Sequence, residues 1–351
     1  MTGTATAPTA QAPLGTEDTP RTAFSRLTIL VGLLVLLAAL TMLSFFVGSG
    51  DISAADTWNA LFHPTGTLND QLIRTERVPR TFMALVVGAA LGVAGALMQA
   101  ITLNPLADPG ILGVNAGAYF FMALGIVAFG VTSTTGNIAF AMLGALIAAA
   151  AVYLIGATGR RGAGPAKLIL AGVALSAVFN GIAQGMTLVD PKAFDAIRQW
   201  QVGSLQGAST EVLGKIMPFV IAGIVVALLL VASLNVLALG DDRARALGAR
   251  VGLIRSTGFA SVTILCGAGT AAVGPITFLG LMVPHAVRMI VGPDQRWVVP
   301  GSLVVAPIIF LASDMIGRVI TPSELPVGMV TAFIGAPVLI YLVRRRGDRS
   351  L

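Results

Sequence analysis

Long apolar segments alternate with short polar ones along almost the whole chain. A helix of about 20 apolar residues is long enough to cross the ~30 Å hydrocarbon core of a bilayer. The charge-free stretch 256–287 is too long for one span, and its Gly274–Pro275 pair predicts a reversal between two short helices. The apolar windows are 28–47, 81–103, 111–130, 137–158, 168–189, 216–239, 256–273, 276–291, 297–316 and 325–343. This pattern predicts an all-α polytopic membrane protein with about ten transmembrane helices.

The composition agrees with a membrane environment. Of the 351 residues, 56% are hydrophobic and 11% are charged, whereas soluble proteins carry roughly 25% charged residues. The first window is too long for the apolar core of a signal peptide, so we expect it to remain as a helix. Residues 1–25 are mostly Thr, Ala, Pro and Gly, which predicts a disordered cytoplasmic tail. We expect one transmembrane domain over 26–346 and a short cytoplasmic tail over 347–351.

The basic residues indicate how the helices are oriented, because cytoplasmic loops of membrane proteins carry an excess of Lys and Arg. If the N-terminus is cytoplasmic, ten spans place the C-terminus there too. Most of the 22 Lys and Arg residues then fall in cytoplasmic segments. We therefore expect both termini and the charged stretch 239–255 on the cytoplasmic side.

The stretch 239–255 reads LGDDRARALGARVGLIR and is the most charged segment between two apolar windows. Asp241 and Asp242 favour the start of a helix, where carboxylates meet the positive end of the helix dipole. Apolar positions at spacings of three and four, ending with Leu247 and Val251, predict one small apolar face. Two interpretations are open: a solvated loop that carries positive-inside arginines, or a docking surface for a soluble cytoplasmic partner.

The outer end of the second window carries three arginines in the stretch 74–80, RTERVPR, against the positive-inside trend. Long basic side chains can extend to lipid headgroups, and Glu76 offers a local partner. The alternative is a basic surface for an acidic partner. Arg318 lies at another outer helix end, where it can face such a partner or pair with Asp314 four residues earlier.

The stretch 104–110, NPLADPG, interrupts the helical pattern because its prolines cannot continue a helix smoothly. We expect the chain to turn there at the cytoplasmic side, with Asp108 outside the bilayer. Polar residues within the spans are either pathway-lining groups or hydrogen-bonding groups between helices. These candidates are Gln99, Asn115, Asn180 and Gln184.

The motifs of several enzyme classes are absent from the sequence. There is no phosphate-binding G-x-x-x-x-G-K-[ST], no G-x-S-x-G, no H-E-x-x-H and no Cys/His cluster, so we expect no catalytic site, cofactor or metal in this chain. The single Cys266 excludes a disulfide framework. An ion-coupled secondary transporter would need ionisable groups at mid-span, whereas only Asp314 comes near that position. A transporter that is powered by a separate ATPase fits these observations better than a membrane hydrolase does.

A long segment after the first window matches a known family. Residues 77–118, RVPRTFMALVVGAALGVAGALMQAITLNPLADPGILGVNAGA, resemble the signature of the FecCD-type permeases. These are the membrane subunits of ABC importers for ferric siderophores, haem and vitamin B12. Further matches are 200–209, 239–252, 273–296 and 323–345, so the resemblance covers about 25–346.

The resemblance implies a BtuC/FecCD-like permease fold in the bacterial cytoplasmic (inner) membrane. It implies a second permease subunit, identical or homologous, and two cytoplasmic ABC ATPase subunits that use ATP and Mg. It also implies an extracytoplasmic substrate-binding protein, and it gives no role to nucleic acid. The expected cargo is a ferric siderophore, with vitamin B12 or haem as the alternative.

The resemblance also assigns roles to individual residues. The segment 239–252 corresponds to the coupling helices that enter a cleft of the ATPase, with Asp242, Arg243, Arg245, Leu247, Gly248, Arg250 and Val251 as its contact residues. Arg77 and Arg80 match the R-x-x-R motif that pairs with glutamates of the binding protein, and Arg74 and Arg318 are weaker matches. The cytoplasmic gate corresponds to Asn104, Leu106, Ala163 and Gly164.

Overall fold

The computed structural model describes residues 23–48, 52–157 and 165–347, and in these ranges every regular element is a helix. The expected tails lie mostly outside the described residues, which start with the first helix and end at Gly347. The helices are α1 (Ala23–Phe46), α2 (Ala54–Phe62), α3 (Leu68–Leu72), the π-helical η1 (Ile73–Arg77), α4 (Val78–Thr102), the 3₁₀-helical η2 (Pro109–Leu112), α5 (Val114–Phe129), α6 (Thr134–Ala157), α7 (Pro165–Val189), α8 (Pro191–Gln201), α9 (Thr210–Leu237), α10 (Asp241–Ala246), α11 (Val251–Val273), α12 (Leu279–Val291), α13 (Gln295–Ile320) and α14 (Val327–Gly347).

Each of the ten apolar windows forms a helix, and the all-α polytopic fold is confirmed. Seven helices among the described residues are long and apolar enough to cross a membrane, whereas α5, α12 and the apolar part of α14 are shorter. The predicted reversal is confirmed, since α11 ends at Val273 and α12 begins at Leu279. With 13 residues, α12 is about 20 Å long, which is less than the ~30 Å hydrocarbon core.

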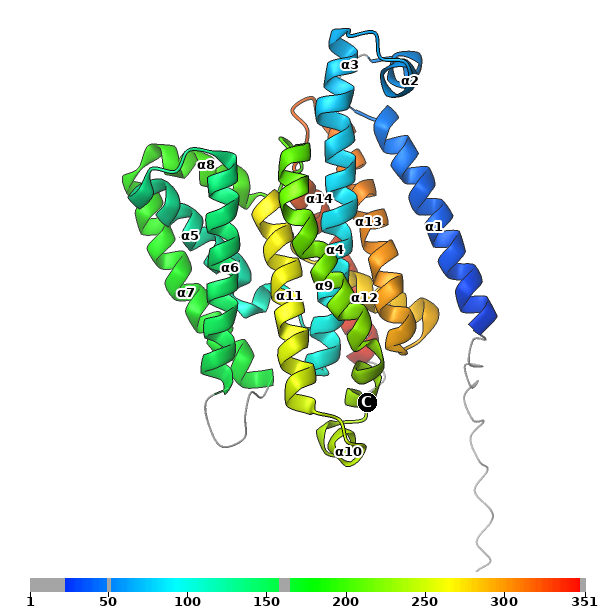
Figure 1. The fold of residues 1–351 in the computed structure, drawn as a ribbon, viewed down its shortest axis with the longest axis vertical. Coiled ribbons are helices and arrows are strands. Elements are labelled where there is room, and N and C mark those ends of the chain that lie inside the picture. The colour runs from blue at the N-terminus through cyan, green and yellow to red at the C-terminus, as the bar shows by residue number, and fades with distance from the viewer. Residues whose placement is uncertain (1–22, 49–51, 158–164, 348–351) are drawn as a thin grey trace, which may run out of the picture.

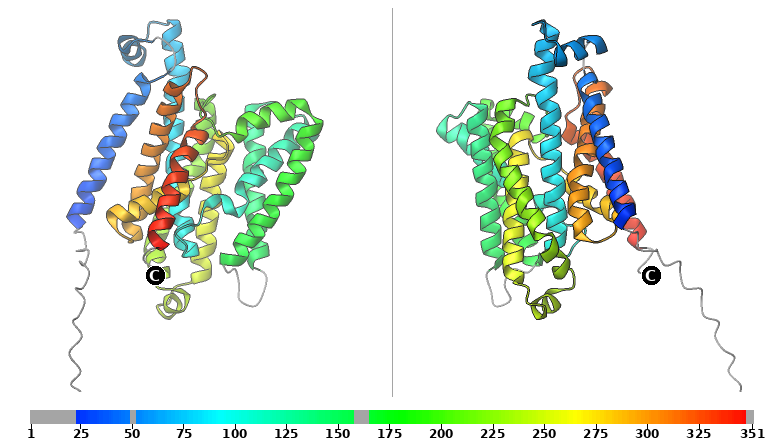
Figure 2. Two further views of the ribbon diagram at one scale, coloured as in Figure 1. Left: turned by 180° about the vertical axis from the view of Figure 1, so that it is seen from behind. Right: turned by 45° about the vertical axis from the view of Figure 1, so that its right-hand side comes forward.

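The helices pack around α4, which contacts α9, α11, α12 and α13. In its most apolar window the helix that contains α4 is 78% buried, whereas the corresponding window of α1 is only 11% buried. Figure 1 shows α1 at one side of the molecule, beside α13, and the group α5 to α8 at the other side. The view from behind in Figure 2 shows the α5–α8 group again on the side of the molecule away from α1.

Small residues allow several of these helices to approach closely. In α5 a Cβ added at Gly117 would lie 2.4 Å from the carbonyl oxygen of Gly144 in α6, and one added at Gly144 would lie 2.2 Å from that of Gly117. In the same way, Gly95 of α4 packs against the backbone of Gly280 in α12. Such contacts are a main source of helix association where the hydrophobic effect between helices is weak.

The segment between α4 and α5 corrects one expectation. The chain turns after α4, where Leu103 has a left-handed backbone (φ 52°), but it does not stay at the membrane surface. Asp108 caps η2 by accepting a hydrogen bond from Gly110 N at 2.7 Å, and it lies close enough to interact electrostatically with Cys266, well inside α11. Non-helical backbone at this depth is tolerated because protein surrounds it rather than lipid.

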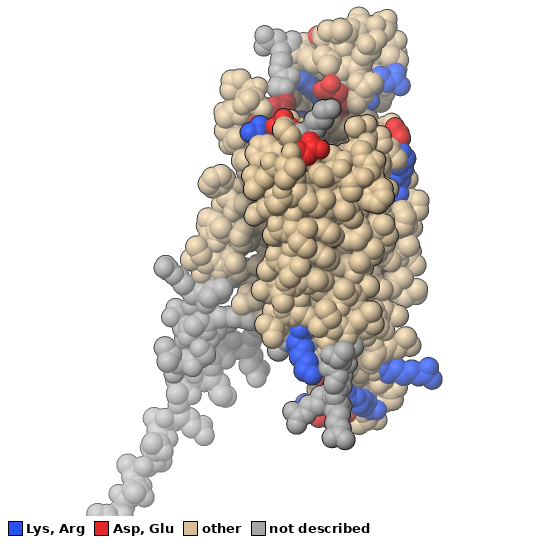
Figure 3. Space-filling view, turned by 90° about the vertical axis from the view of Figure 1, so that its left-hand side faces the viewer, with Lys and Arg blue, Asp and Glu red and all other residues tan. Residues whose placement is uncertain are grey.

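The charged side chains gather at the two ends of the molecule. On the face that Figure 3 shows, Lys, Arg, Asp and Glu lie in two bands, and the surface between them carries none of these residues. This arrangement fits a protein that spans a bilayer, because burying charge in hydrocarbon is costly. The two polar ends are therefore where soluble partners can reach the protein.

The contact between Gly117 and Gly144 leads to a first prediction. We expect Gly117→Val to lower the thermal midpoint of the purified protein in detergent, since an overpacked core costs about 1–3 kcal/mol. Gly32→Val is the matched control, because nothing lies within 4 Å of a Cβ built on Gly32 in α1. Equal midpoints for the two variants would contradict the close packing of α5 on α6.

Candidate functional site

The loop that contains α10 projects from one end of the molecule (Figure 1). Its acidic first turn, Asp241 and Asp242, is as expected from the sequence. After α10 the chain turns at Gly248, whose φ of +82° favours glycine, and open space surrounds the position of its missing Cβ. Leu247 is 66% exposed. The arginines Arg243, Arg245 and Arg250 are also exposed around it.

The apolar face of this loop is smaller than the sequence predicted. Val251 does not accompany Leu247 on the surface: it is the first residue of α11 and is 4% exposed. The turn at Gly248 lies between the two residues, so the spacing of four does not bring them to one helix face. The exposed apolar side chain of the turn is therefore Leu247, with exposed Leu239 before α10 and Leu253 after it.

An ion pair that sequence reasoning missed holds this loop against the bundle. Arg255 of α11 donates to both carboxylate oxygens of Asp241, at 2.9 Å each, and its Nε donates to the carbonyl oxygen of Ile101 near the end of α4. A two-point Arg–carboxylate contact restricts orientation as well as distance. The loop, α11 and the end of α4 are thus joined through one side chain.

A second polar contact joins α9 to α13 at the same end. Asp294 caps α13 through Arg296 N and accepts from Asn235 Nδ2 at 2.6 Å, while Asn235 Oδ1 accepts from Gln295 N. Burial acts to raise the pKa of Asp294, but these hydrogen bonds and the nearby charges of Arg296 and Arg26 keep that pKa below its ordinary value. The carboxylate therefore stays ionised at neutral pH.

At the opposite end, buried charges join α4, α13 and the loop before α14. Arg80 contacts Asp314 through Nε at 3.0 Å and through NH2 at 2.7 Å, and its NH1 donates to Glu324 at 2.6 Å. Asp314 is fully buried and also accepts from Arg318. Gln206 donates to the same oxygen of Glu324 that Arg80 contacts. The open question about Arg318 is thus answered by geometry: it pairs with Asp314.

Arg77 and Arg80, the residues of the R-x-x-R motif, do not extend outward together in this structure. Arg77 is 8% exposed and donates to the carbonyl oxygen of Phe45, and Arg318 is 2% exposed and donates to the carbonyls of Ser44 and Val47. Buried charges are stable only with partners, and the bundle supplies these partners itself. Of the four arginines, Arg74 is the exposed one.

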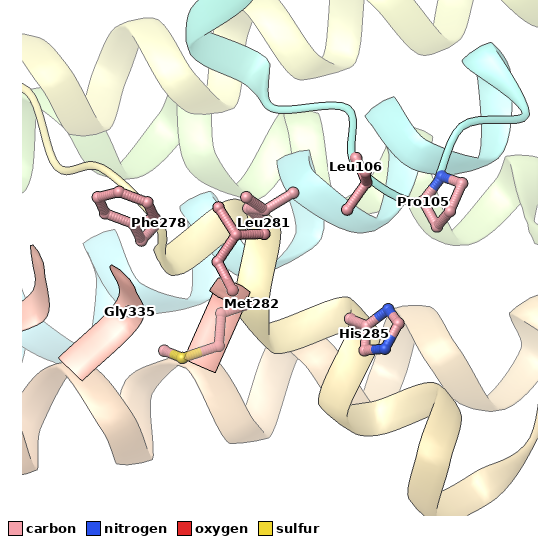
Figure 4. Close-up of a pocket in the computed structure, with 8 residues that line it drawn as sticks. Pro105, Leu106, Phe278, Leu281, Met282, His285 and Gly335 are labelled. Carbon is pink, nitrogen blue, oxygen red and sulfur yellow. The ribbon is translucent and has the colours of Figure 1, made fainter. Parts of the chain in front are cut away.

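Leu106 lies beside a hollow near the loop end of α4. It is 42% exposed, and Figure 4 shows it with Leu281 and Met282 on facing segments around the hollow. Asn104 supports this turn, since its side-chain oxygen accepts from Leu106 N. Ala163 and Gly164, the other expected gate residues, lie outside the described residues.

The four polar candidates within the spans fall into two groups. Gln99 is buried and bonds neighbouring segments, because it donates to the carbonyl of Leu281 and accepts from Arg288 at 2.6 Å. Asn115 and Asn180 line one cavity of about 360 Å³. Gln184 lies one turn after Asn180 on the exposed face of α7.

That face of α7 is unusual for a membrane helix. It exposes two amide side chains, Asn180 and Gln184, beside Gly181 and Gly185, which have open space around them. Exposed amides are costly in contact with lipid. The view from behind in Figure 2 shows α7 and α14 uncovered on the same side of the molecule.

Comparison with known proteins gives a consistent result. A family model described as the FecCD transport family matches residues 36–345. The ferric enterobactin transport system permease protein FepD of Escherichia coli (strain K12) is 46% identical, covering 92% of this chain and 97% of that protein. The Probable siderophore transport system permease protein YfiZ of Bacillus subtilis (strain 168) is 40% identical with the same coverage.

One solved structure is similar over nearly its full length. It is described as an inward-facing conformation of a metal-chelate type ABC transporter, with a TM-score of 0.80 and 30% sequence identity. The match covers 91% of this chain and 99% of the chain in the solved structure. The similarity therefore extends over the whole helical domain rather than over one motif.

Proposed function

This chain belongs to the FecCD transport family, and on that premise we propose that it is the permease subunit of an ABC importer for a ferric siderophore. The similarity to an enterobactin permease over nearly the whole of both chains is the observation that supports this substrate class most strongly. The family consists of permease subunits, and the ATPase is a separate subunit. Haem and vitamin B12 are the alternatives, and a hemin transport system permease protein of Yersinia pestis is 35% identical.

We propose that the loop around α10 receives the force of ATP hydrolysis. Leu247 is the apolar contact, the exposed arginines surround it, and Asp242, also exposed, lies at the start of α10. The Asp241–Arg255 contact ties this loop to α11 and α4, so a displacement of the loop is transmitted into the bundle. Val251 contributes indirectly by fixing the start of α11. The partners are two cytoplasmic ATPase subunits, which bind the ATP and Mg.

We propose that the opposite end receives the substrate-binding protein. Arg74 offers an exposed positive charge there. Arg80 is held by Asp314 and Glu324, so it reaches a carboxylate of a partner only by exchanging Glu324. Arg77 and Arg318 support this region through backbone carbonyls at the end of α1. In this proposal the main role of the R-x-x-R motif is to join the helices at the outer end. Its contact with the binding protein is secondary.

The exposed amide face of α7 supports a second permease subunit. Lipid is a poor environment for Asn180 and Gln184, and a facing subunit would enclose them along a shared pathway with Asn115. Leu106 and Asn104 would narrow its cytoplasmic end. We propose that the multi-pass chain lies in the bacterial inner membrane with both termini cytoplasmic, because this orientation puts the arginines of the α10 loop on the side that the positive-inside rule favours.

The coupling proposal is tested in proteoliposomes that contain the whole importer. We expect the wild-type complex to import ferric enterobactin only with ATP. Leu247→Asp should reduce import at least tenfold, because burying an unpaired carboxylate in the ATPase cleft is costly. Uptake of radioactive iron and release of phosphate are measured together.

Leu247→Met is the matched control, because it keeps an apolar side chain at the same position, where Leu247 is 66% exposed. It should import normally. If the Leu247→Asp complex imports normally and still holds its ATPase subunits, the α10 loop is not the coupling contact. A wild-type complex that imports none of ferric enterobactin, ferric citrate and a ferric hydroxamate would contradict the proposed substrate class.

The docking proposal is tested by the affinity of the binding protein for the detergent-purified importer. We expect Arg74→Glu to weaken it several-fold at low ionic strength and less at high salt, since exposed pairs contribute ~0–1 kcal/mol and are screened. Arg198→Glu, at an exposed position of α8, is the control for a general loss of positive charge. An Arg74→Glu affinity equal to that of Arg198→Glu at every salt concentration would remove Arg74 from the docking surface.

A further inference from the structure

The side chain of Gln99 joins α4 to α12 through hydrogen bonds at two separate points. Its Nε2 donates to the carbonyl oxygen of Leu281 at 3.0 Å, and its Oε1 accepts from NH1 of Arg288 at 2.6 Å. Gln99 is only 3% exposed. Because Leu281 and Arg288 lie about two helical turns apart, one buried amide contacts most of the length of α12.

Pro284 lies within α12, between these two contact points. A proline has no backbone N–H, and its ring clashes with the carbonyl four residues earlier, here that of Gly280, so it weakens the helix around it. Sharp bends in helices usually occur at such positions. The two bonds of Gln99 therefore hold α12 on both sides of the point where it bends most easily.

The two parts of α12 pack on different neighbours. Before Pro284, Gly280 lies against α4, since a Cβ added at Gly95 would lie 1.9 Å from the carbonyl oxygen of Gly280. After Pro284, Val287 lies against α13, since a Cβ added at Gly301 would lie 2.6 Å from it. The bond from Arg288 to Gln99 ties this second part to α4 as well.

Gln99 also lies between the α10 loop and the hollow beside Leu106. The carbonyl of Ile101, two residues after Gln99, accepts from Arg255, which holds the α10 loop. On the other side of Gln99, Leu281 lines the hollow together with Leu106 (Figure 4). A continuous set of contacts thus runs from the α10 loop through the end of α4 to this hollow.

We infer that Gln99 is a positioning residue for transport, a role that rests on the proposed function. It keeps the end of α4 and both parts of α12 moving as one body, so a displacement of the α10 loop changes the hollow beside Leu106 instead of bending α12 at Pro284. An amide suits this role because it donates and accepts at the same time. Gln99 acts through α12 and needs no contact with the chelate.

The inference is tested in proteoliposomes that contain the whole importer. Ferric enterobactin is the probe, and ferric citrate or a ferric hydroxamate replaces it if that is what the wild type imports. We expect Gln99→Met, which keeps the side-chain length but loses both hydrogen bonds, to lower the import rate about 3- to 10-fold. ATPase stimulation by the loaded binding protein should continue. Arg288 is half-buried and lines an open cavity of about 340 Å³, so water can reach its charge in this variant.

A second readout follows the hollow itself. Leu106→Cys is labelled with a maleimide in the detergent-purified importer, in a Cys266→Ser background. We expect ATP to change the labelling rate when Gln99 is present and to leave it unchanged in Gln99→Met. A residue that only stabilises the fold would lower the thermal midpoint and leave this ATP response in place, which would contradict the inference.

Gln99→Glu separates the two hydrogen bonds. A carboxylate still accepts from Arg288 but cannot donate to the carbonyl of Leu281, so we expect this variant to lose import as Gln99→Met does. Gln71→Met is the matched control, because it makes the same substitution at an exposed position of the same long helix. It should import normally.

The other outcomes are equally distinct. Wild-type import by Gln99→Met would overturn the inference while leaving the proposed function intact. Normal import by Gln99→Glu would also overturn it, because pairing with Arg288 alone would then be sufficient. A loss of import together with a loss of ATPase stimulation would do the same, since the variant would then fail in folding or docking. Failure of the wild type to import any of the three chelates would instead contradict the proposed function.

Discussion

The requirement that no polar backbone or unpaired charge face hydrocarbon governs the rest of this structure. It confines the charged residues to the two ends, and it requires the non-helical segment before α5 and the segment before α12 to be enclosed by helices. Asp108 illustrates the point. Its carboxylate accepts a hydrogen bond from Gly110 N, and helices pack around it. The resulting interior contains small residues, short helices and a few amide side chains that bond neighbouring segments.

One long helix joins the two polar ends. From Leu68 to Thr102 the chain is helical without a break over 35 residues, or about 52 Å, so this helix extends beyond a ~30 Å hydrocarbon core. At its outer end Arg80 is bound to Asp314 and Glu324, and near its other end the carbonyl of Ile101 accepts from Arg255. The same Arg255 holds the α10 loop, so the proposed ATPase contact and the proposed docking end share one rigid element.

The sequence predicted the spans well because a bilayer imposes one simple condition, a long apolar run. It predicted the reversal at Gly274–Pro275 for the same local reason. It did not predict the partners of Arg80 or Arg255, since Glu324 and Asp241 are brought to them by tertiary packing and not by helical periodicity. Val251 was misplaced because a glycine turn interrupts the spacing that was assumed to continue.

The central claim is that the α10 loop and the outer end of the long helix lie on opposite sides of the membrane, where different partners act on them. Labelling of single cysteines with an impermeant maleimide tests it directly, in a Cys266→Ser background. The account predicts that Leu68→Cys reacts in intact spheroplasts and that Arg245→Cys reacts only after the membrane is opened. Labelling of Arg245→Cys from outside would contradict the orientation and, with it, the assignment of the ATPase contact.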